Sequence, residues 1–197
     1  MTTEPMATEP QWTGDREAKP APGRLRRVQA LINTLDLETG QDRLADAAHA
    51  RPWLVANGLL GPEDPLSRED LELVVDFREA LRDMVDRSPQ GHGRARDPAV
   101  CERIGASVGA RVEVTGDGEV RLAPLGEAVP ARLLQMLLDI RDAQHDGSWR
   151  HLKACANEEC RWVFYDRSRN HAGAWCEMAT CGNQAKNREF RARRRVT

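Results

Sequence analysis

Four of the five cysteines of this chain gather near its carboxyl end and form two pairs with the same spacing. Cys155 and Cys160 make one C-x4-C pair, and Cys176 and Cys181 make the other. Two short segments that each offer two thiolates match the closed tetrahedral site of a structural zinc ion, because soft sulfur ligands bind zinc strongly. Four unrelated buried thiols are the alternative. The paired spacing favours zinc, and we predict one structural Zn²⁺ bound by these four residues.

The residues around the cysteines also suit a structural ion better than a catalytic one. A catalytic zinc keeps one position open for water, whereas four cysteines complete the tetrahedron. We therefore expect His151 and His171 to lie on the surface or outside the ligand set. The fifty residues after Gly147 carry little apolar mass, mainly in Trp162, Phe164, Trp175 and Phe190. Metal binding would supply the folding energy that so small a core lacks.

A predicted helix follows the last cysteine. The sequence "GNQAKNREFRARRR" contains good helix formers and no proline, and Asn183 can cap it. A basic helix beside a zinc site can neutralise phosphates and release counterions, which predicts contact with nucleic acid. The residues expected to make this contact, with double-stranded DNA if the family resemblance described below holds, are Arg167, Arg169, Lys186, Arg188, Arg191, Arg194 and Arg195. A solvated charge run without a function is the alternative.

The charges are divided unevenly along the chain. From residue 151 onward ten cations face five acids, giving +5, whereas the preceding residues hold 19 cations and 26 acids, giving −7. No stretch approaches the roughly 18 apolar residues of a membrane span, and the start of the chain has no apolar signal region. We expect a soluble cytoplasmic protein. No phosphate-binding loop, HExxH motif or nucleophile triad indicates an enzyme.

The composition divides the chain into three parts. Residues 1–23 contain four prolines and one large apolar residue, Trp12, which predicts a disordered leader. Residues 24–147 are expected to form a helical domain, and residues 148–197 a zinc finger. The predicted fold class is mainly α with a small β-hairpin (α+β), in which a helical N-terminal domain precedes a small four-cysteine zinc finger that ends in a basic helix.

Local signals place the individual elements. Apolar residues at three- and four-residue spacing predict helices from Arg24 and, after Pro130, up to about Gly147. Another helix should begin near Gln41 and stop at the Asn-Gly pair at 57–58, with Pro52 kinking it or beginning a new turn. A further helix should begin after Ser67, a capping residue, and end before Pro89.

Two strand pairs are also predicted. Valines and a leucine alternate with polar residues on both sides of the Gly-Asp-Gly sequence at 116–118, which is typical of a β-hairpin. The segment "RWVFYD" is rich in aromatic and β-branched residues, which favours a strand that pairs with the chain around Cys155.

The helical domain offers weaker functional signals. Polar groups interrupt apolar helical faces around Asn33, Asp36 and Trp53, so these residues are candidate contacts for a small-molecule effector. Cys101 stands apart from the other cysteines, and we expect a small buried side chain there in preference to a sensor thiol. A homodimer would suit a protein that reads paired half-sites.

The residues around the cysteines resemble a known family. The segments "WVFYDRSRN" and "WCEMATCGN" and the arginine-rich end are similar to the CGNR zinc finger of bacterial proteins, and "LINTLD" and "WLVANGLL" resemble the ABATE domain that precedes it. The resemblance implies a stress-related transcription regulator that binds DNA, with Cys155, Cys160, Cys176 and Cys181 as zinc ligands and the upstream domain as sensor. Gln184 replaces the arginine of the CGNR motif. Glutamine would favour adenine where arginine prefers guanine.

Three functions are therefore compared. The first is a zinc-dependent, DNA-binding transcriptional regulator whose helical domain senses a small molecule or a partner. The second is an adaptor whose zinc module makes only protein contacts. The third is a redox switch in which oxidation of the thiolates ejects zinc and releases the helix.

Overall fold

The structure is a computed structural model that describes residues 17–86 and 98–196, without the side chains of residues 188, 189, 192, 193, 195 and 196. Its helices are α1 (Leu25–Ile32), α2 (Ala47–Ala56), α3 (Arg68–Val85), α4 (Ala99–Ser107), α5 (Val129–His145) and α6 (Asn183–Val196). Its strands are β1 (Ala110–Val114), β2 (Val120–Pro124), β3 (Leu152–Ala154) and β4 (Val163–Tyr165). Short helical turns lie at η2 (Ser148–His151) and η3 (Met178–Gly182). The predicted fold class, mainly α with a small β-hairpin, is confirmed.

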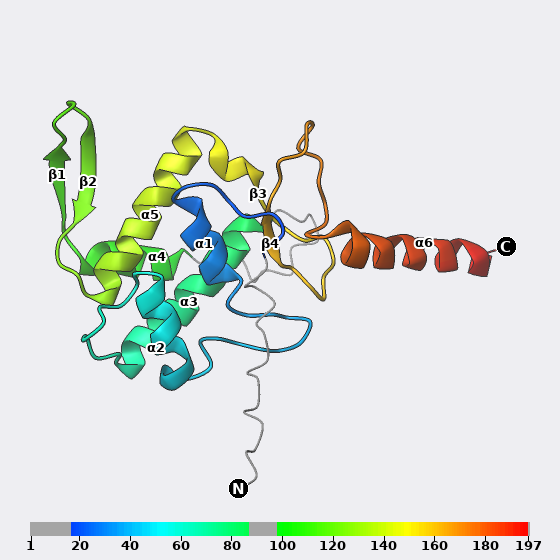
Figure 1. The fold of residues 1–197 in the computed structure, drawn as a ribbon, viewed down its shortest axis with the longest axis horizontal. Coiled ribbons are helices and arrows are strands. Elements are labelled where there is room, and N and C mark those ends of the chain that lie inside the picture. Colours follow the sequence, from blue (N-terminus) through cyan, green and yellow to red (C-terminus); the bar gives the residue numbers. More distant parts are fainter. Residues whose placement is uncertain (1–16, 87–97, 197) are drawn as a thin grey trace, which may run out of the picture.

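Helices α1, α3 and α5 contact one another and enclose the core of a helical bundle, shown in Figure 1. Val28 of α1, Phe77 and Leu81 of α3, and Leu133 of α5 are fully buried there. Within each helix the apolar side chains recur every three or four residues, so they share one face. Helix α4 packs against α3 and α5 and adds Ile104 to the same core. The periodicity of the sequence thus identifies most of the bundle.

The ends of α2 and α3 show where local signals succeed and fail. Ser67 Oγ accepts a hydrogen bond from Asp70 N–H at 3.0 Å, which confirms the predicted start of α3. Helix α2 begins at Ala47, later than the predicted start near Gln41. Backbone bonds such as Asp36 N–H to the Gln41 carbonyl, at 2.9 Å, hold the preceding residues in a turn instead. Pro52 lies inside α2, which ends before the Asn-Gly pair as predicted.

Both predicted strand pairs are present. Strands β1 and β2 are antiparallel, with Val112 opposite Leu122 and Val114 opposite Val120. Their connection contains Gly118 at a φ of 85°, a left-handed conformation that glycine adopts without a side-chain clash. Strands β3 and β4 are also antiparallel, and they lie in the finger.

The finger hairpin is packed onto the bundle. Leu152, Val163 and Tyr165 belong to the same buried apolar cluster as the bundle helices. Asn33, at the end of α1, donates from Nδ2 to the Val163 carbonyl at 2.8 Å and accepts from Val163 N–H at 2.9 Å. Gln29 of α1 donates to the same carbonyl at 3.0 Å. Side chains from α1 and from the residue that directly follows it therefore satisfy the backbone groups of β4 at Val163.

Residues 17–23 also lie along this junction. The carbonyl of Lys19 accepts from Tyr165 N–H at 3.0 Å, and the Glu17 carboxylate accepts from Trp162 Nε1–H at 2.9 Å. Ala21 is buried in the bundle core. For residues 17–23 the structure thus differs from the predicted disordered leader, because the partners that order this segment are supplied by distant parts of the chain. The rest of the predicted leader lies outside the described residues.

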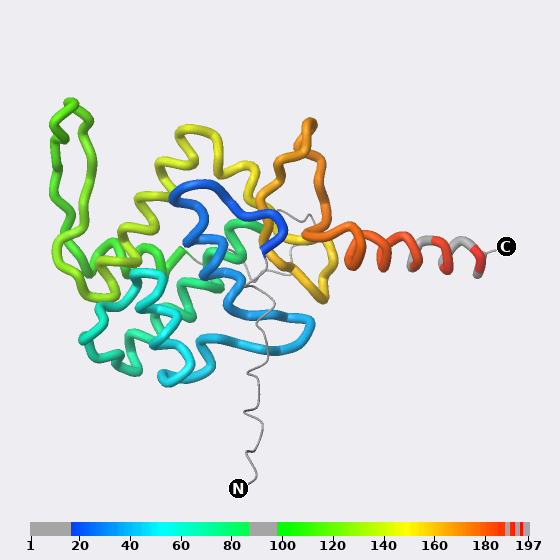
Figure 2. Tube along the Cα trace, in the orientation of Figure 1, coloured from blue at the N-terminus to red at the C-terminus, as the bar shows by residue number. Residues whose placement is uncertain are grey.

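The two ends of the molecule carry different elements. Figure 2 shows α6 extending away from the bundle and the β1–β2 hairpin standing at the opposite end. Among the described residues, no helix has both the length and the apolar composition that crossing a membrane requires.

Candidate metal centre

The first pair of cysteines lies on a tight turn that leaves the finger hairpin. Cys155 directly follows β3, and its N–H donates to the Trp162 carbonyl at 2.9 Å. The Asn157 carbonyl accepts the N–H groups of Cys160 and Arg161, both at 2.9 Å. Arg161 adopts a φ of 46°, which turns the chain back toward β4. This turn brings the sulfur atoms of Cys155 and Cys160 within 4.8 Å of each other.

The second pair lies at the entrance to α6. Cys176 precedes the π-helical turn η3, and Cys181 lies within that turn, directly before the first residues of α6. Gly182 is buried, and a Cβ atom there would overlap the Met178 Sδ atom, so a larger residue would require the Met178 side chain to shift. The site ties the hairpin of the finger to the start of its terminal helix.

The four sulfur atoms have the geometry of a zinc site. All lie within 4.8 Å of one another, with 3.7 Å between the Sγ atoms of Cys160 and Cys176 and 3.8 Å between those of Cys176 and Cys181. A tetrahedron with zinc–sulfur bonds of about 2.3 Å has neighbouring sulfurs about 3.8 Å apart. None of the four forms a disulfide. The residues therefore fit one structural Zn²⁺, as predicted.

The protonation of the cluster also suits a metal. Hydrogen bonds from the thiols of Cys160 and Cys176 lower the pKa of Cys155 below its ordinary value. The same bond to Cys155 raises the pKa of Cys160 above its ordinary value. The cluster thus already stabilises one thiolate, and a bound cation supplies the charge that stabilises the others. Its role is structural, because four protein ligands leave no position for a reacting group.

Outer groups hold the ligands in place. Trp162 and Trp175 pack against the buried cysteines. The buried Asn157 directs Nδ2 toward Cys181 Sγ at 3.7 Å and donates to Gln184 Oε1 at 3.3 Å. Gln184, which replaces the arginine of the family motif, thus accepts this bond through its amide oxygen, beside the metal site. Recognition of adenine would require the same oxygen. Nothing in the sequence pattern distinguished Asn157 as its partner.

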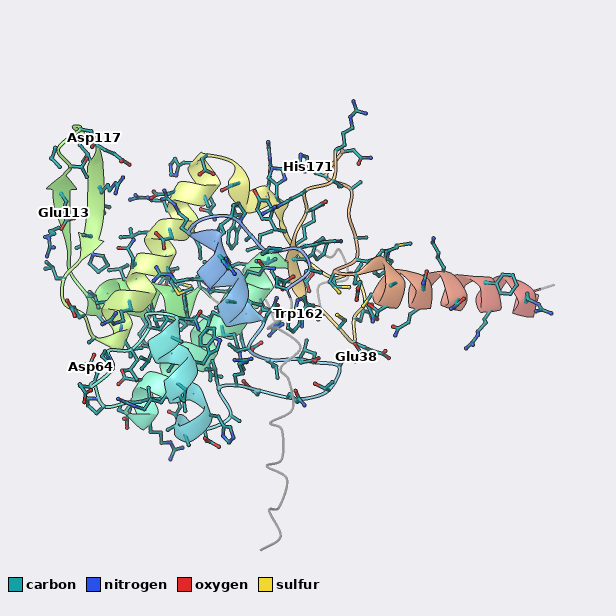
Figure 3. All side chains as sticks on the ribbon, in the orientation of Figure 1. Glu38, Asp64, Glu113, Asp117, Trp162 and His171 are labelled. Atoms are coloured by element: carbon teal, nitrogen blue, oxygen red, sulfur yellow. The ribbon has the colours of Figure 1, made fainter. Side chains whose placement is uncertain are left out.

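The two histidines lie outside the cysteine cluster. Their ring centroids are 4.0 Å apart, and His171 is exposed on the loop after β4, as Figure 3 shows. That loop is fixed by Asp166, which is buried and accepts from Lys153 Nζ at 2.7 Å and from Gly173 N–H at 2.8 Å. Ser168 donates to the same carboxylate through both N–H and Oγ–H. Asp166 thus positions the chain that leads from β4 to Cys176.

Replacing Asp166 with asparagine should destabilise the protein by about 1–3 kcal/mol, because it removes the charge of a buried carboxylate whose partner, Lys153, is only partly buried. Burial acts to raise the pKa of Asp166, but bonds from Lys153, Ser168 and Gly173 outweigh it and lower this pKa below that of an ordinary aspartate. The stabilisation is therefore present above the ordinary pKa of about 4 and is lost as the pH falls below it. The difference between wild type and D166N in urea unfolding at several pH values measures both effects, because loss of zinc at low pH affects the two proteins alike. The matched variant D117N, in the exposed hairpin turn, should change stability by less than about 0.5 kcal/mol.

The cations expected to contact DNA fall into two groups. Lys186, Arg191 and Arg194 are exposed on α6. The side chains of Arg188 and Arg195, also in α6, lie outside the described residues. Arg167 and Arg169 are exposed on the loop after β4, where Arg167 donates to the Pro20 carbonyl at 3.0 Å. Phe190, expected in the core of the finger, is instead 60% exposed on α6.

The candidate effector contacts have structural partners. Both polar ends of the Asn33 amide bind β4, as described above. The Asp36 carboxylate accepts from the N–H groups of Glu38 and Thr39, at 2.9 and 3.2 Å. Trp53 is half-buried against the bundle core. Cys101 packs against the same core, and burial raises the pKa of its thiol. These contacts show packing roles, and effector binding at Asn33, Asp36 and Trp53 stays a prediction.

A four-cysteine site that joins a short hairpin to a terminal helix defines a zinc-finger module, here attached to a helical domain. Residues 151–194 match the family model of the CGNR zinc finger, and residues 25–152 match the ABATE model, described as "Putative stress-induced transcription regulator". The ABATE model covers more than half of the chain, which therefore belongs to the ABATE family and ends in a CGNR zinc finger. Neither family is a family of enzymes. A comparison with curated proteins finds no match.

Proposed function

We propose that this protein is a zinc-dependent transcriptional regulator in the cytoplasm, which binds double-stranded DNA through α6 and responds to a small molecule or partner through its helical domain. The observation that carries the proposal is the position of Cys181 within η3, two residues before α6 begins at Asn183. A zinc ion bound there would fix the direction of α6 relative to the finger. A helix held in this way can lie in the major groove, which is about 12 Å wide.

The charge of α6 supports contact with DNA. Between Asn183 and Val196 the sequence has six cations and one acid, a net charge of +5 in a chain of net charge −2. Four thiolates with one Zn²⁺ carry −2 at the start of the helix, so the positive field should be strongest toward its carboxyl end. Figure 1 shows that this end points away from the acidic body of the protein. A polyanion could therefore approach it without meeting the bundle.

The junction between bundle and finger supports a role for the helical domain in regulation. Arg161, within the first cysteine turn, forms ion pairs with Asp86 at 3.0 Å and with Asp83 at 3.6 Å, at the end of α3. Gln29 of α1 and Asn33, which directly follows this helix, bind β4. A ligand that shifts α1 or α3 would therefore act on the segment that carries Cys155 and Cys160.

The proposal is tested by binding of zinc-loaded protein to duplex DNA at a series of salt concentrations. We expect the logarithm of the binding constant to fall linearly with the logarithm of salt, by about 0.9 for each phosphate contacted. A slope near zero, or no binding at low salt, would contradict it. Sequencing of genomic DNA that the protein retains would then identify the site that it reads.

An adaptor that uses the finger only for protein contacts is the second candidate. The observation in its favour is the exposure of Phe190 on α6 and of Met178 at its base, since exposed aromatic and methionine side chains are enriched at protein interfaces. Absence of DNA binding at low salt, with zinc present in equal amount to the chain, would favour this function.

A further inference from the structure

The β1–β2 hairpin has an apolar face that the described part of the chain leaves exposed. Val112, Val114 and Val120 are 64%, 68% and 67% exposed, and Leu122 is 37% exposed. The register places these four side chains opposite one another in two cross-strand pairs, so they form one continuous surface. An antiparallel sheet of a single domain usually turns its apolar face toward the core. A two-stranded hairpin is also barely stable in water without further contacts.

The other face of the hairpin is charged, and its charges are balanced within the chain. Arg111 pairs with Glu113 at 2.6 Å, and Arg121 pairs with Glu119. Figure 3 marks Glu113 and Asp117 on this protruding element. The charges of this face are therefore balanced within each arm of the hairpin, whereas the apolar face stays exposed among the described residues.

The backbone hydrogen bonds show which edge is open. Thr115 N–H donates to the Glu119 carbonyl and Leu125 N–H to the Gly109 carbonyl, so the odd-numbered residues of β1 bond to β2. By alternation, the backbone groups of Ala110, Val112 and Val114 point away from β2. On the outer edge of β2, Pro124 has no N–H to donate, and β2 packs against α5. The open edge of the hairpin is therefore that of β1.

We propose that two copies of this chain dimerise by antiparallel pairing of their β1 strands about a two-fold axis at Val112. In this register Val112 faces Val112 of the other chain, and Ala110 faces the partner's Val114. The outward N–H and C=O groups of Ala110, Val112 and Val114 therefore all form hydrogen bonds between the two chains. The two hairpins become one four-stranded sheet. The aliphatic side chains of both copies then lie next to one another on one face of this sheet. The cross-strand pair of Val112 side chains at the axis stabilises the dimer.

The alternating charges of β1 indicate that the strand that pairs with its open edge is β1 of a second copy of this chain. With the axis at Val112, Arg111 lies opposite the partner's Glu113, and Glu113 lies opposite the partner's Arg111. Moving the axis by one residue toward either end places Arg111 opposite Arg111 or Glu113 opposite Glu113, which is unfavourable because like charges directly opposite repel. The strand is thus complementary to itself in one register. An unrelated strand has no reason to carry the matching charges.

The dimer goes beyond the proposed function and does not rest on it, since its test measures mass and not DNA binding. Sedimentation of the zinc-loaded full chain over a range of concentrations should give the mass of two chains. R111E and E113R should each weaken dimerisation by about 10- to 100-fold, because both copies then present like charges across the axis. An equimolar mixture of the two variants should dimerise as wild type does, because every such pair then joins opposite charges.

A proline pair supplies the matched control. Val112 and Val120 are equally exposed, and the N–H of each points to an outer edge of the hairpin. V112P should abolish the dimer by removing the donor at the axis, whereas V120P, on the edge of β2, should retain it. A wild-type chain that stays monomeric at every concentration would overturn the proposal. So would equal weakening by the two proline variants, or a mixture of R111E and E113R that stays monomeric.

Discussion

Replacing Cys181 with serine is expected to remove zinc from the protein and to release α6 from the finger. A serine hydroxyl is a poor zinc ligand, because it does not ionise near neutral pH as a coordinating thiol does. Loss of groups that only orient a ligand lowers metal affinity by about 10- to 100-fold, so loss of a ligand should cost more. Elemental analysis of purified protein should find about one zinc per wild-type chain and less than about 0.1 per C181S chain.

Unfolding of the terminal part of the finger, including α6, should accompany the loss of metal. Zinc binding contributes about 10–16 kcal/mol of apparent free energy to small zinc-finger peptides. Here the hairpin β3–β4 is also held by the bundle through Val163, Tyr165 and Asn33. We therefore expect C181S, or wild type in strong chelator, to keep the bundle and the β3–β4 hairpin but to lose protection of α6 in hydrogen exchange. Low pH should have the same effect, because protons compete with zinc for the thiolates.

Cys101 provides the control for this experiment. It packs against the bundle core and is not part of the cysteine cluster. C101S should bind one zinc and protect α6 as wild type does. Retention of zinc by C181S, or an α6 that stays protected in chelator, would show that sulfur ligands do not hold this part of the protein.

Neutralising Arg191 and Arg194 together should produce the largest loss of DNA binding among surface variants. Both side chains are exposed on α6, and the guanidinium of Arg194 lies 5.7 Å from the centre of the Phe190 ring. If each contacts one phosphate, the salt slope should fall by about 1.8, at about 0.9 per phosphate. The affinity at low salt should drop by about 10- to 100-fold, and the zinc content should stay at one per chain.

The matched control removes two arginines from the bundle. Arg68 of α3 and Arg103 of α4 are exposed and form surface ion pairs with Glu72 and Asp76. The variant R68A/R103A lowers the net charge by the same amount as R191A/R194A, so the two separate a local contact from an effect of overall charge. Equal losses of affinity in the two variants would argue against binding through α6. A loss in R191A/R194A alone supports it.

The sequence predicted the features that depend on neighbouring residues. The spacing of the cysteine pairs fixes which sulfur atoms can meet, and the structure places all four within 4.8 Å of one another. Ser67 caps α3 because its hydroxyl reaches an N–H only three residues away. The turn at Gly118 and the strand pair around Cys155 likewise follow from residue types within a few positions. These elements needed no knowledge of the rest of the chain.

Tertiary structure alone decided how the finger and the bundle join. The bond from Asn33 to Val163 connects residues 130 positions apart, and the bond from Trp162 to Glu17 connects residues 145 positions apart. No local pattern reports such contacts, because they form only when packing brings distant segments together. For the same reason, the sequence did not predict the bonds that Asn33 forms with β4 and that Asp36 forms within a turn, and Phe190, expected in a core, was found exposed. Local chemistry determined the zinc ligands and the helices of this protein, whereas the burial of Val163 and Tyr165 in the bundle core determined that the finger is fixed to the helical domain.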